Sequence, residues 1–216
     1  MAIQKLAQKV LRLKVTDMRK GGIKYKQKFG QIEKREKEIK EIVDRIEKVY
    51  EGWKEIVRRF PKEIANFFSY KVLPEIEKIK PQDLEKILNQ LIEKYNDKEY
   101  SPVTFGLLLS LLINRTVDEY VKAEMQKGKK INEIKPLNIV LDLERVKKPP
   151  CLIGYENRDK SYLTIMGNLG HWVGYFMKGG KLIIKGRVKS FGLSAFCQSN
   201  KGEIWYKGKR IWPKAS

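Results

Sequence analysis

The residues of this chain that could carry out chemistry are few and widely separated. There is one histidine, His171, and there are two cysteines, Cys151 and Cys197, which stand 46 positions apart. A structural zinc site takes four ligands, mostly cysteine and histidine at short spacings, and this sequence offers no such cluster. We therefore expect neither a metal site nor a cofactor. Two cysteines also predict a reducing, cytoplasmic setting rather than a disulfide framework.

His171 is the residue whose side chain could act as a general base. Such a base works best beside an orienting carboxylate, and residues 151–216 contain only Glu156, Asp159 and Glu203. We therefore predict no catalytic residue and a protein that is not an enzyme. A self-standing enzyme that depends on His171 stays open as a third hypothesis.

The glycines around His171 raise the question of a phosphate-binding loop. Six glycines lie within the twenty residues from Gly167 to Gly186. A Walker loop reads GxxxxGK[ST] and stands between a strand and a helix. Here Leu182 follows Lys181 where serine or threonine is required, and an apolar strand pattern comes next. The spacing also misses the GxGxxG dinucleotide fingerprint, so we expect no nucleotide cradle.

Binding chemistry is better represented, because aromatic and basic residues are interleaved in the C-terminal part. Single-stranded and looped nucleic acids are bound by rings that stack on bases and by cations that meet phosphates. Part of any such aromatic set is expected to be core in so small a domain. The aromatic residues concerned are Trp172, Tyr175, Phe176, Trp205, Tyr206 and Trp212.

A second basic segment, "RKGGIKYKQK" from Arg19 to Lys28, contains no acidic residue. With the C-terminal cations it predicts nucleic acid, RNA or DNA, as the partner. The candidate nucleic-acid-binding residues are Arg19, Lys20, Lys24, Lys26, Lys28, Lys178, Lys181, Lys185, Arg187, Lys189, Trp205, Tyr206, Lys207, Lys209 and Arg210.

The distribution of charge supports a polyanionic partner. The 216 residues carry a formal net charge of +20 at pH 7, divided as +9 over residues 1–40, +2 over residues 41–150 and +9 over residues 151–216. Each cation that meets a phosphate releases a condensed counterion, which favours polyanions. Acidic protein surfaces are the other partner that such a field attracts. A third possibility is that the charge only keeps the protein soluble.

The elements that must position these residues fall into two kinds, and helices come first. Lysine-separated apolar residues from Ile3 to Leu13, followed by Gly21 and Gly22, predict a basic amphipathic segment over residues 1–22. A seven-residue repeat then predicts a long helix over residues 32–60 with a coiled-coil stripe, which needs an antiparallel helix of this chain or a second subunit. The repeat consists of Ile32, Ile39, Ile46, Trp53 and Phe60.

Further helices are predicted over residues 63–79, 81–95 and 102–127, so that residues 23–135 form a helical bundle. Ser101 is the expected N-cap of the last helix, Pro102 its first residue and Gly128 its end. The most apolar run, Phe105 to Ile113, covers about half of a membrane span, so we expect a buried helix and no span.

After Lys135 and Pro136 the period changes to that of short strands. "LTIMG", "LIIKG" and "IWYKG" begin at Leu163, Leu182 and Ile204, at offsets of 19 and 22 residues. Strands that end in glycine and return about every twenty residues are typical of a solenoid. Leu169, Val173 and Met177 are expected to point inward. The expected corners, where the chain turns or coils approach closely, are Gly167, Gly170, Gly174, Gly179, Gly180 and Gly186.

One coil resembles a known family, the GXGXG-type right-handed β-helix of the C-terminal domain of the glutamate synthase large subunit and of the C subunit of formylmethanofuran dehydrogenase. The next coil departs from the pattern, because Lys189 stands where a glycine is expected. The resemblance covers about a quarter to a third of the chain and excludes the helical part. It implies a structural, subunit-contacting element without catalytic residues. The matching residues are Gly167, Gly170, Gly174, Met177, Gly179, Gly180, Ile183 and Gly186.

The sequence therefore predicts an α+β protein: a basic segment over residues 1–22, an α-helical bundle with a coiled-coil-like helix over residues 23–135, and a short right-handed β-helix over residues 136–216. We expect a non-enzymatic binding or assembly protein that contacts nucleic acid through both basic ends. The alternative is an accessory structural subunit of a larger redox or amidotransferase complex. Self-association or a partner protein is expected at the residue 32–60 helix.

Overall fold

The computed structural model describes residues 30–51, 79–97, 100–198 and 200–213. The chain divides into two compact units, Met1–Glu41 and Ile42–Ser216. Three predicted parts lie outside the described residues: the basic segment over residues 1–22, residues 52–60 of the residue 32–60 helix, and residues 63–78 of the helix predicted over residues 63–79.

Three α-helices are present in the described part of the chain. Residues 30–51 are helical, α3 is Pro81–Asp97 and α4 is Pro102–Gln126. The expected apolar face of α3, which includes Leu84, Ile87 and Leu91, is buried. Ser101 occupies the N-cap of α4 but its side chain makes no capping hydrogen bond, so proline at the first position is the working start signal. Gly128, whose φ is +87°, follows the helix end.

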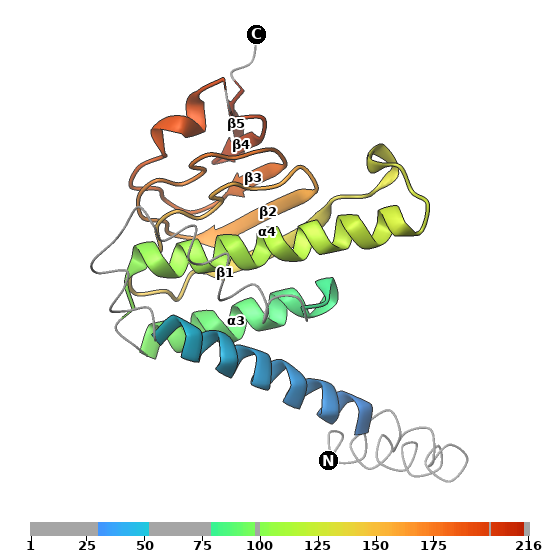
Figure 1. The fold of residues 1–216 in the computed structure, drawn as a ribbon. Coiled ribbons are helices and arrows are strands. Elements are labelled where there is room, and N and C mark those ends of the chain that lie inside the picture. The colour runs from blue at the N-terminus through green and yellow to red at the C-terminus, as the bar shows by residue number, and fades with distance from the viewer. Residues whose placement is uncertain (1–29, 52–78, 98–99, 199, 214–216) are drawn as a thin grey trace, which may run out of the picture. The chain divides into compact units, whose positions relative to one another are not determined.

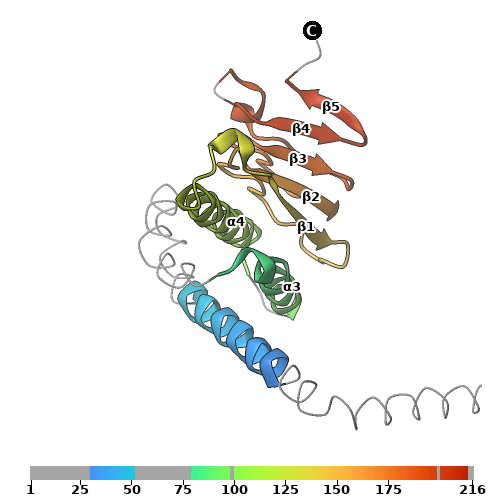
Figure 2. The ribbon, with the colours of Figure 1, turned by 90° about the vertical axis from the view of Figure 1, so that its right-hand side faces the viewer.

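The rest of the chain is a short β-solenoid, as the repeat predicts. Strands β1 (Leu137–Leu143), β2 (Ser161–Gly167), β3 (Lys181–Ile184) and β4 (Glu203–Tyr206) pair in parallel and in chain order. β5 (Lys209–Trp212) folds back antiparallel on β4. Figures 1 and 2 show the five strands stacked, with α3 and α4 at the β1 end. The predicted α+β class with a short β-solenoid is therefore confirmed.

The solenoid core is built from stacked positions of successive coils. Register places Ile139 beside Leu163, Leu163 beside Leu182 and Leu182 beside Ile204, and all four side chains are buried. Because alternate side chains of a strand point to opposite faces, this register fills one interior column with branched aliphatic residues. The opposite wall contains Leu169, Val173 and Met177, which are buried as expected.

Both ends of the strand stack are finished by other elements. At the β1 end, the Glu85 carboxylate of α3 accepts a hydrogen bond from the Val140 backbone N–H at 3.0 Å, which occupies an edge donor of β1. At the other end, the β4–β5 hairpin turns through Lys207 and Gly208, which both have positive φ. Open strand edges invite pairing with other chains. The Glu85 contact and the β4–β5 hairpin reduce the number of unpaired backbone groups at the two ends of the strand stack.

α4 packs on the solenoid as well as on α3. The Cys151 backbone N–H donates to the Pro102 carbonyl oxygen at 2.9 Å, and α4 lies so close that a Cβ on Gly106 would overlap the Cys151 carbonyl group. The buried run from Phe105 to Ile113 therefore packs against the solenoid as well as against α3. Helical periodicity does not reveal this contact. The predicted boundary near Lys135 falls between a 3-10 turn, Ile131–Glu133, and β1.

Among the described helices, none combines the length and apolar character that a bilayer crossing requires.

Candidate nucleic-acid interface

We number the coils by the strand that begins each of them, so that β1, β2, β3 and β4 begin the first, second, third and fourth coils. Five cations gather where the strands of the third and fourth coils end. Lys185, Arg187 and Lys189 follow β3, whereas Lys207 and Lys209 follow β4, and all five side chains are exposed. We call this set the basic corner.

Hydrogen bonds between coils fix the backbone of the basic corner. The Lys185 N–H donates to Ile165 O at 3.0 Å, and the Lys207 N–H donates to Ile184 O at 3.2 Å. The Arg187 carbonyl oxygen accepts from the Leu169 N–H at 2.8 Å. These cations are therefore presented by stacked coils rather than by independent loops.

The described part of the chain does not neutralise the basic corner. Among the described residues, no carboxylate forms an ion pair or hydrogen bond with any of its five side chains. Lys207 Nζ lies 5.3 Å from the centre of the Tyr206 ring, a cation–π contact that leaves its charge intact. Several like charges on one edge produce a positive potential that attracts polyanions.

Two other predicted cations are engaged within the protein. Lys178 Nζ lies 2.8 Å from a Glu156 carboxylate oxygen, which joins the second coil to the first. Lys181 Nζ lies 3.5 Å from Glu203 and 4.3 Å from the centre of the Trp205 ring.

Trp205 is correspondingly less available than its type suggests. Its indole N–H donates to Glu203 at 2.9 Å, and this bond, with Lys181, lowers the pKa of the Glu203 carboxyl. Register places Trp205 beside Ile183 on the outer face of the sheet, whereas Ile204 points inward. Lys181, Glu203 and Trp205 thus form a closed group on the sheet face.

The remaining predicted residues divide between the hairpin and the undescribed segment. Arg210 is exposed on β5, and Tyr206 is half-buried with its ring 5.6 Å from that of Phe191. The five residues of the N-terminal set, Arg19, Lys20, Lys24, Lys26 and Lys28, lie outside the described residues.

The six predicted corner glycines occupy two kinds of position. Gly167, Gly174 and Gly180 have φ values of +94°, +69° and +70°, which a residue with a side chain rarely adopts. The other three have ordinary φ, but a Cβ there would overlap a neighbouring coil; on Gly186, for example, it would overlap the Gly167 carbonyl group. This second group consists of Gly170, Gly179 and Gly186.

His171 and Cys151 take part in contacts between successive coils. His171 Nδ1 lies 3.0 Å from Ser190 Oγ of the next coil, and the His171 backbone N–H donates to Cys151 Sγ at 3.2 Å. Cys151 is buried, and Cys197 is a half-buried residue elsewhere in the solenoid. Within the described residues, no three side chains of the metal-binding types are grouped as a site.

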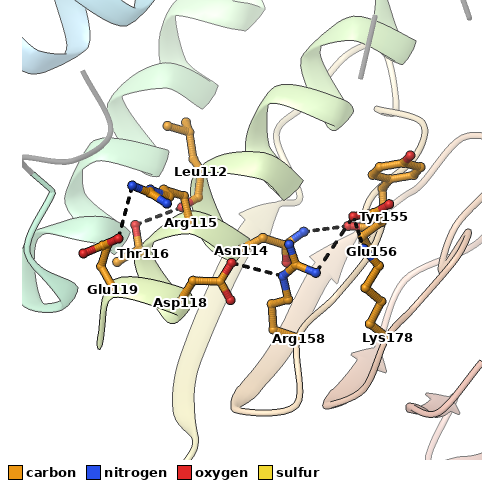
Figure 3. A network of polar contacts seen from close by, with 10 residues as sticks. All are labelled: Leu112, Asn114, Arg115, Thr116, Asp118, Glu119, Tyr155, Glu156, Arg158 and Lys178. Carbon is orange, nitrogen blue, oxygen red and sulfur yellow. Dashed lines mark hydrogen bonds and ion pairs between the residues drawn. The ribbon is translucent and has the colours of Figure 1, made fainter. Parts of the chain in front are cut away.

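A polar network joins α4 to the first coil, and sequence reasoning did not anticipate it. Asn114 donates from its side-chain amide to Tyr155 O at 2.8 Å, and Arg158 Nε lies 3.3 Å from Asp118. Figure 3 shows the Arg158 guanidinium between Asp118 and Glu156. Burial raises the pKa of the Asp118 carboxyl, and the attraction of Arg158 only partly opposes this.

The same junction borders a surface pocket of about 230 Å³ whose lining includes Val117, Asp118, Arg158 and Lys178. Acidic and basic groups share its wall, so it has no clear charge preference.

Two exposed aromatic side chains, Trp172 and Phe176, belong to the interleaved aromatic residues of the sequence but not to the candidate nucleic-acid-binding residues. Each is 47% exposed. Their residue type was visible in the sequence, but their exposure depends on the path of the second coil.

Comparison with family models, with curated proteins and with solved structures found no match to this chain.

Proposed function

We propose that this chain is a non-enzymatic protein that binds nucleic acid through the basic corner. The observation that carries the proposal is the set of five exposed cations that no described carboxylate neutralises, held on stacked coils. Phosphates brought to such an edge would release condensed counterions, which provides a favourable and salt-dependent free energy. Lys178 and Lys181 contribute less to this proposal because Glu156 and Glu203 engage them.

The test is the salt dependence of binding by the full-length chain. Fluorescence anisotropy with labelled single-stranded RNA, single-stranded DNA and duplex DNA would cover roughly 50 to 300 mM salt. The variant Lys185→Ser/Arg187→Ser/Lys189→Ser is expected to weaken binding to every probe. It should also reduce the slope of log K against log salt by about 2 for a single strand, because three phosphate contacts are lost.

A matched control removes the same number of positive charges at positions outside the basic corner. Lys80→Ser/Lys86→Ser/Lys122→Ser alters three exposed lysines on or beside the helices, and its slope is expected to stay close to that of the wild type. An equal loss in both triple variants would show that only net charge matters. Absence of binding at the lowest salt would overturn the proposal. Stable co-purification with other polypeptides after nuclease treatment would favour the accessory-subunit alternative.

We also propose that the helix containing residues 30–51 takes part in self-association. Ile32 is 48% exposed at the start of the seven-residue repeat, whereas Ile46 and Tyr50 are buried. In the second unit Lys94 of α3 pairs with both Asp44 and Glu47, at 2.8 Å for Asp44, so α3 already covers part of the stripe. Light scattering tests the proposal: a dimer that Ile32→Lys converts to a monomer is expected, and a monomeric wild type contradicts it.

A further inference from the structure

Trp172 and Phe176 share an unusual combination of backbone and exposure. Their φ values are +58° and +55°, and each side chain is 47% exposed. Large side chains are genuine outliers in the left-handed region, which usually takes glycine or asparagine. We call Trp172 and Phe176, with the adjacent His171 and Tyr175, the aromatic platform.

The left-handed backbone conformation is a repeated feature of the coils and is not particular to Trp172 and Phe176. Alternate residues Leu152, Gly154 and Glu156 of the first coil have φ values of +57°, +78° and +50°. Twenty positions later, the same pattern recurs at residues 172, 174 and 176. Glycine would satisfy this conformation without strain. The chain instead carries aromatic rings there. Both side chains remain 47% exposed, although the centre of the Phe176 ring lies 4.2 Å from that of Tyr175 and 6.4 Å from that of Tyr155.

The platform lies next to the basic corner across one coil-to-coil contact. His171 Nδ1 lies 3.0 Å from Ser190 Oγ, and the Val173 N–H donates to Ser190 O at 3.3 Å. Ser190 directly follows Lys189, whose own N–H donates to Gly170 O at 3.2 Å. The segment that carries the exposed rings of His171 and Trp172 is therefore adjacent to the segment that carries Lys189, a cation without a described carboxylate partner, on the second and third coils.

We propose that the aromatic platform stacks unpaired bases of a single-stranded nucleic acid whose phosphates run along the basic corner. This inference rests on the proposed function and specifies its ligand class. A ring can stack only on a base whose face is open, and duplexes enclose those faces. Cations beside exposed rings match the alternation of phosphate and base along a single strand, whereas an apolar protein partner would not require those cations.

The test variants are Trp172→Gly and Phe176→Gly, because glycine accepts the left-handed backbone and the coil is expected to stay folded. Trp172→Phe keeps a ring at the same position. Tyr162→Thr removes another exposed aromatic side chain, 37% exposed, from the outer face of β2 and serves as the matched control. Circular dichroism and thermal unfolding of each variant check that the fold is retained.

The probes are uridine and thymidine 15-mers, each as a single strand and as a duplex, measured with the full-length chain. We expect single strands to bind more tightly than duplexes. Trp172→Gly is expected to weaken single-strand binding about tenfold or more, in line with the loss of one stacked base. Trp172→Phe and Tyr162→Thr should bind almost as the wild type does. Cross-linking of 5-iodouracil probes should map to the peptide containing residues 171–178, and comparison of the RNA and DNA arms identifies the sugar.

The outcomes separate this inference from the proposed function. If Trp172→Gly binds single strands as well as the wild type does, while the basic-corner variant loses binding, the platform proposal is wrong and the proposed function stands. If the wild type binds no probe, both fail. If the wild type keeps a protein partner after nuclease treatment and Trp172→Gly loses that partner, the platform is a protein-binding site and this proposal is overturned.

Discussion

The hydroxyl oxygen of Ser110, on α4, lies 2.9 Å from the carbonyl oxygen of Leu152, in the first coil of the solenoid. The same hydroxyl oxygen lies 3.1 Å from the Gly154 N–H, which donates to it, and 3.0 Å from Gly106 O of its own helix. The hydroxyl thus accepts a hydrogen bond from the coil and has one hydrogen to share between Leu152 O of the coil and Gly106 O of the helix, so a buried polar group joins helix and coil. α4 consequently closes the first coil rather than only packing in a bundle.

Replacement of this hydroxyl is the first prediction. Ser110→Ala would leave the buried Gly154 N–H without its partner, and such a loss destabilises a fold by about 1–3 kcal/mol. Thr116→Val is the control, because the Thr116 hydroxyl bonds to Leu112 O of its own helix, at 2.8 Å, and to no other described residue. Urea unfolding of both variants measures the difference. Equal losses would mean that the bond across the junction contributes nothing beyond local helix packing.

The second prediction concerns the closeness of α4 to the coil. A Cβ on Gly106 would lie 2.8 Å from the Cys151 carbonyl carbon and closer still to its oxygen, and both are backbone atoms. Gly106→Ala should therefore destabilise the protein by about 3 kcal/mol or more, although alanine favours helices by about 1 kcal/mol. Gly30→Ala, with open space around its Cβ, should change stability by less than about 1 kcal/mol. Thermal unfolding tests the pair, and a stabilising Gly106→Ala would contradict the packing described.

The third prediction separates backbone strain from coil contact. Gly167 and Gly208 both have positive φ, +94° and +77°, but only at Gly167 would a Cβ overlap another coil, 2.5 Å from Leu143 O. Gly208→Ala should cost about 1–2 kcal/mol, the usual strain of a side chain in this region. Gly167→Ala should cost clearly more, because strain and overlap act together. Chemical unfolding of both variants measures the loss of stability. Similar losses in the two variants would show that the spacing between coils adjusts to the added Cβ.

The fourth prediction is a pH dependence at the end of α4. Hydrogen bonds from Lys127, at 2.6 Å, and from Lys129 lower the pKa of the Glu124 carboxyl to about 2. Because the pKa is lower in the folded state, the stabilisation is present above the ordinary value of 4.5 and is lost as the pH falls toward 2.

The measurement compares the wild type with Glu124→Gln from pH 7 to pH 2. The stability advantage of the wild type should be constant above pH 5 and should shrink below it. An NMR titration of the Glu124 side chain gives the pKa directly. A midpoint near 4.5, or a stability difference independent of pH, would contradict the ion pairs.

The sequence alone was sufficient for the elements whose signals are local. Apolar period and terminal residues located α3 and α4, because helix hydrogen bonds join residues four apart. The strand repeat located β2, β3 and β4 and the inward side chains of Leu169, Val173 and Met177, because each coil repeats the same covalent path. The change of period after Pro136 marked where the strands begin, at β1, whereas the antiparallel return of β5 was not predicted.

The site was only partly predictable, because charge pairing and exposure depend on residues distant in the chain. Lys178 and Lys189 look alike in the sequence, yet Lys178 meets Glu156 of the preceding coil and Lys189 meets no described carboxylate. Trp172 and Trp205 likewise differ only in surroundings, since Trp205 lies under Lys181 and Trp172 is exposed.

Sequence thus determined the helices of the described part of the chain, the repeating coils and the excess of positive charge. Tertiary structure decided which helix face closes the first coil, which cations stay unneutralised and which rings meet solvent. The physical reason is that propensity and periodicity act over a few neighbouring residues. Neutralisation and burial are instead set by atoms that come within a few ångströms only when the coils stack.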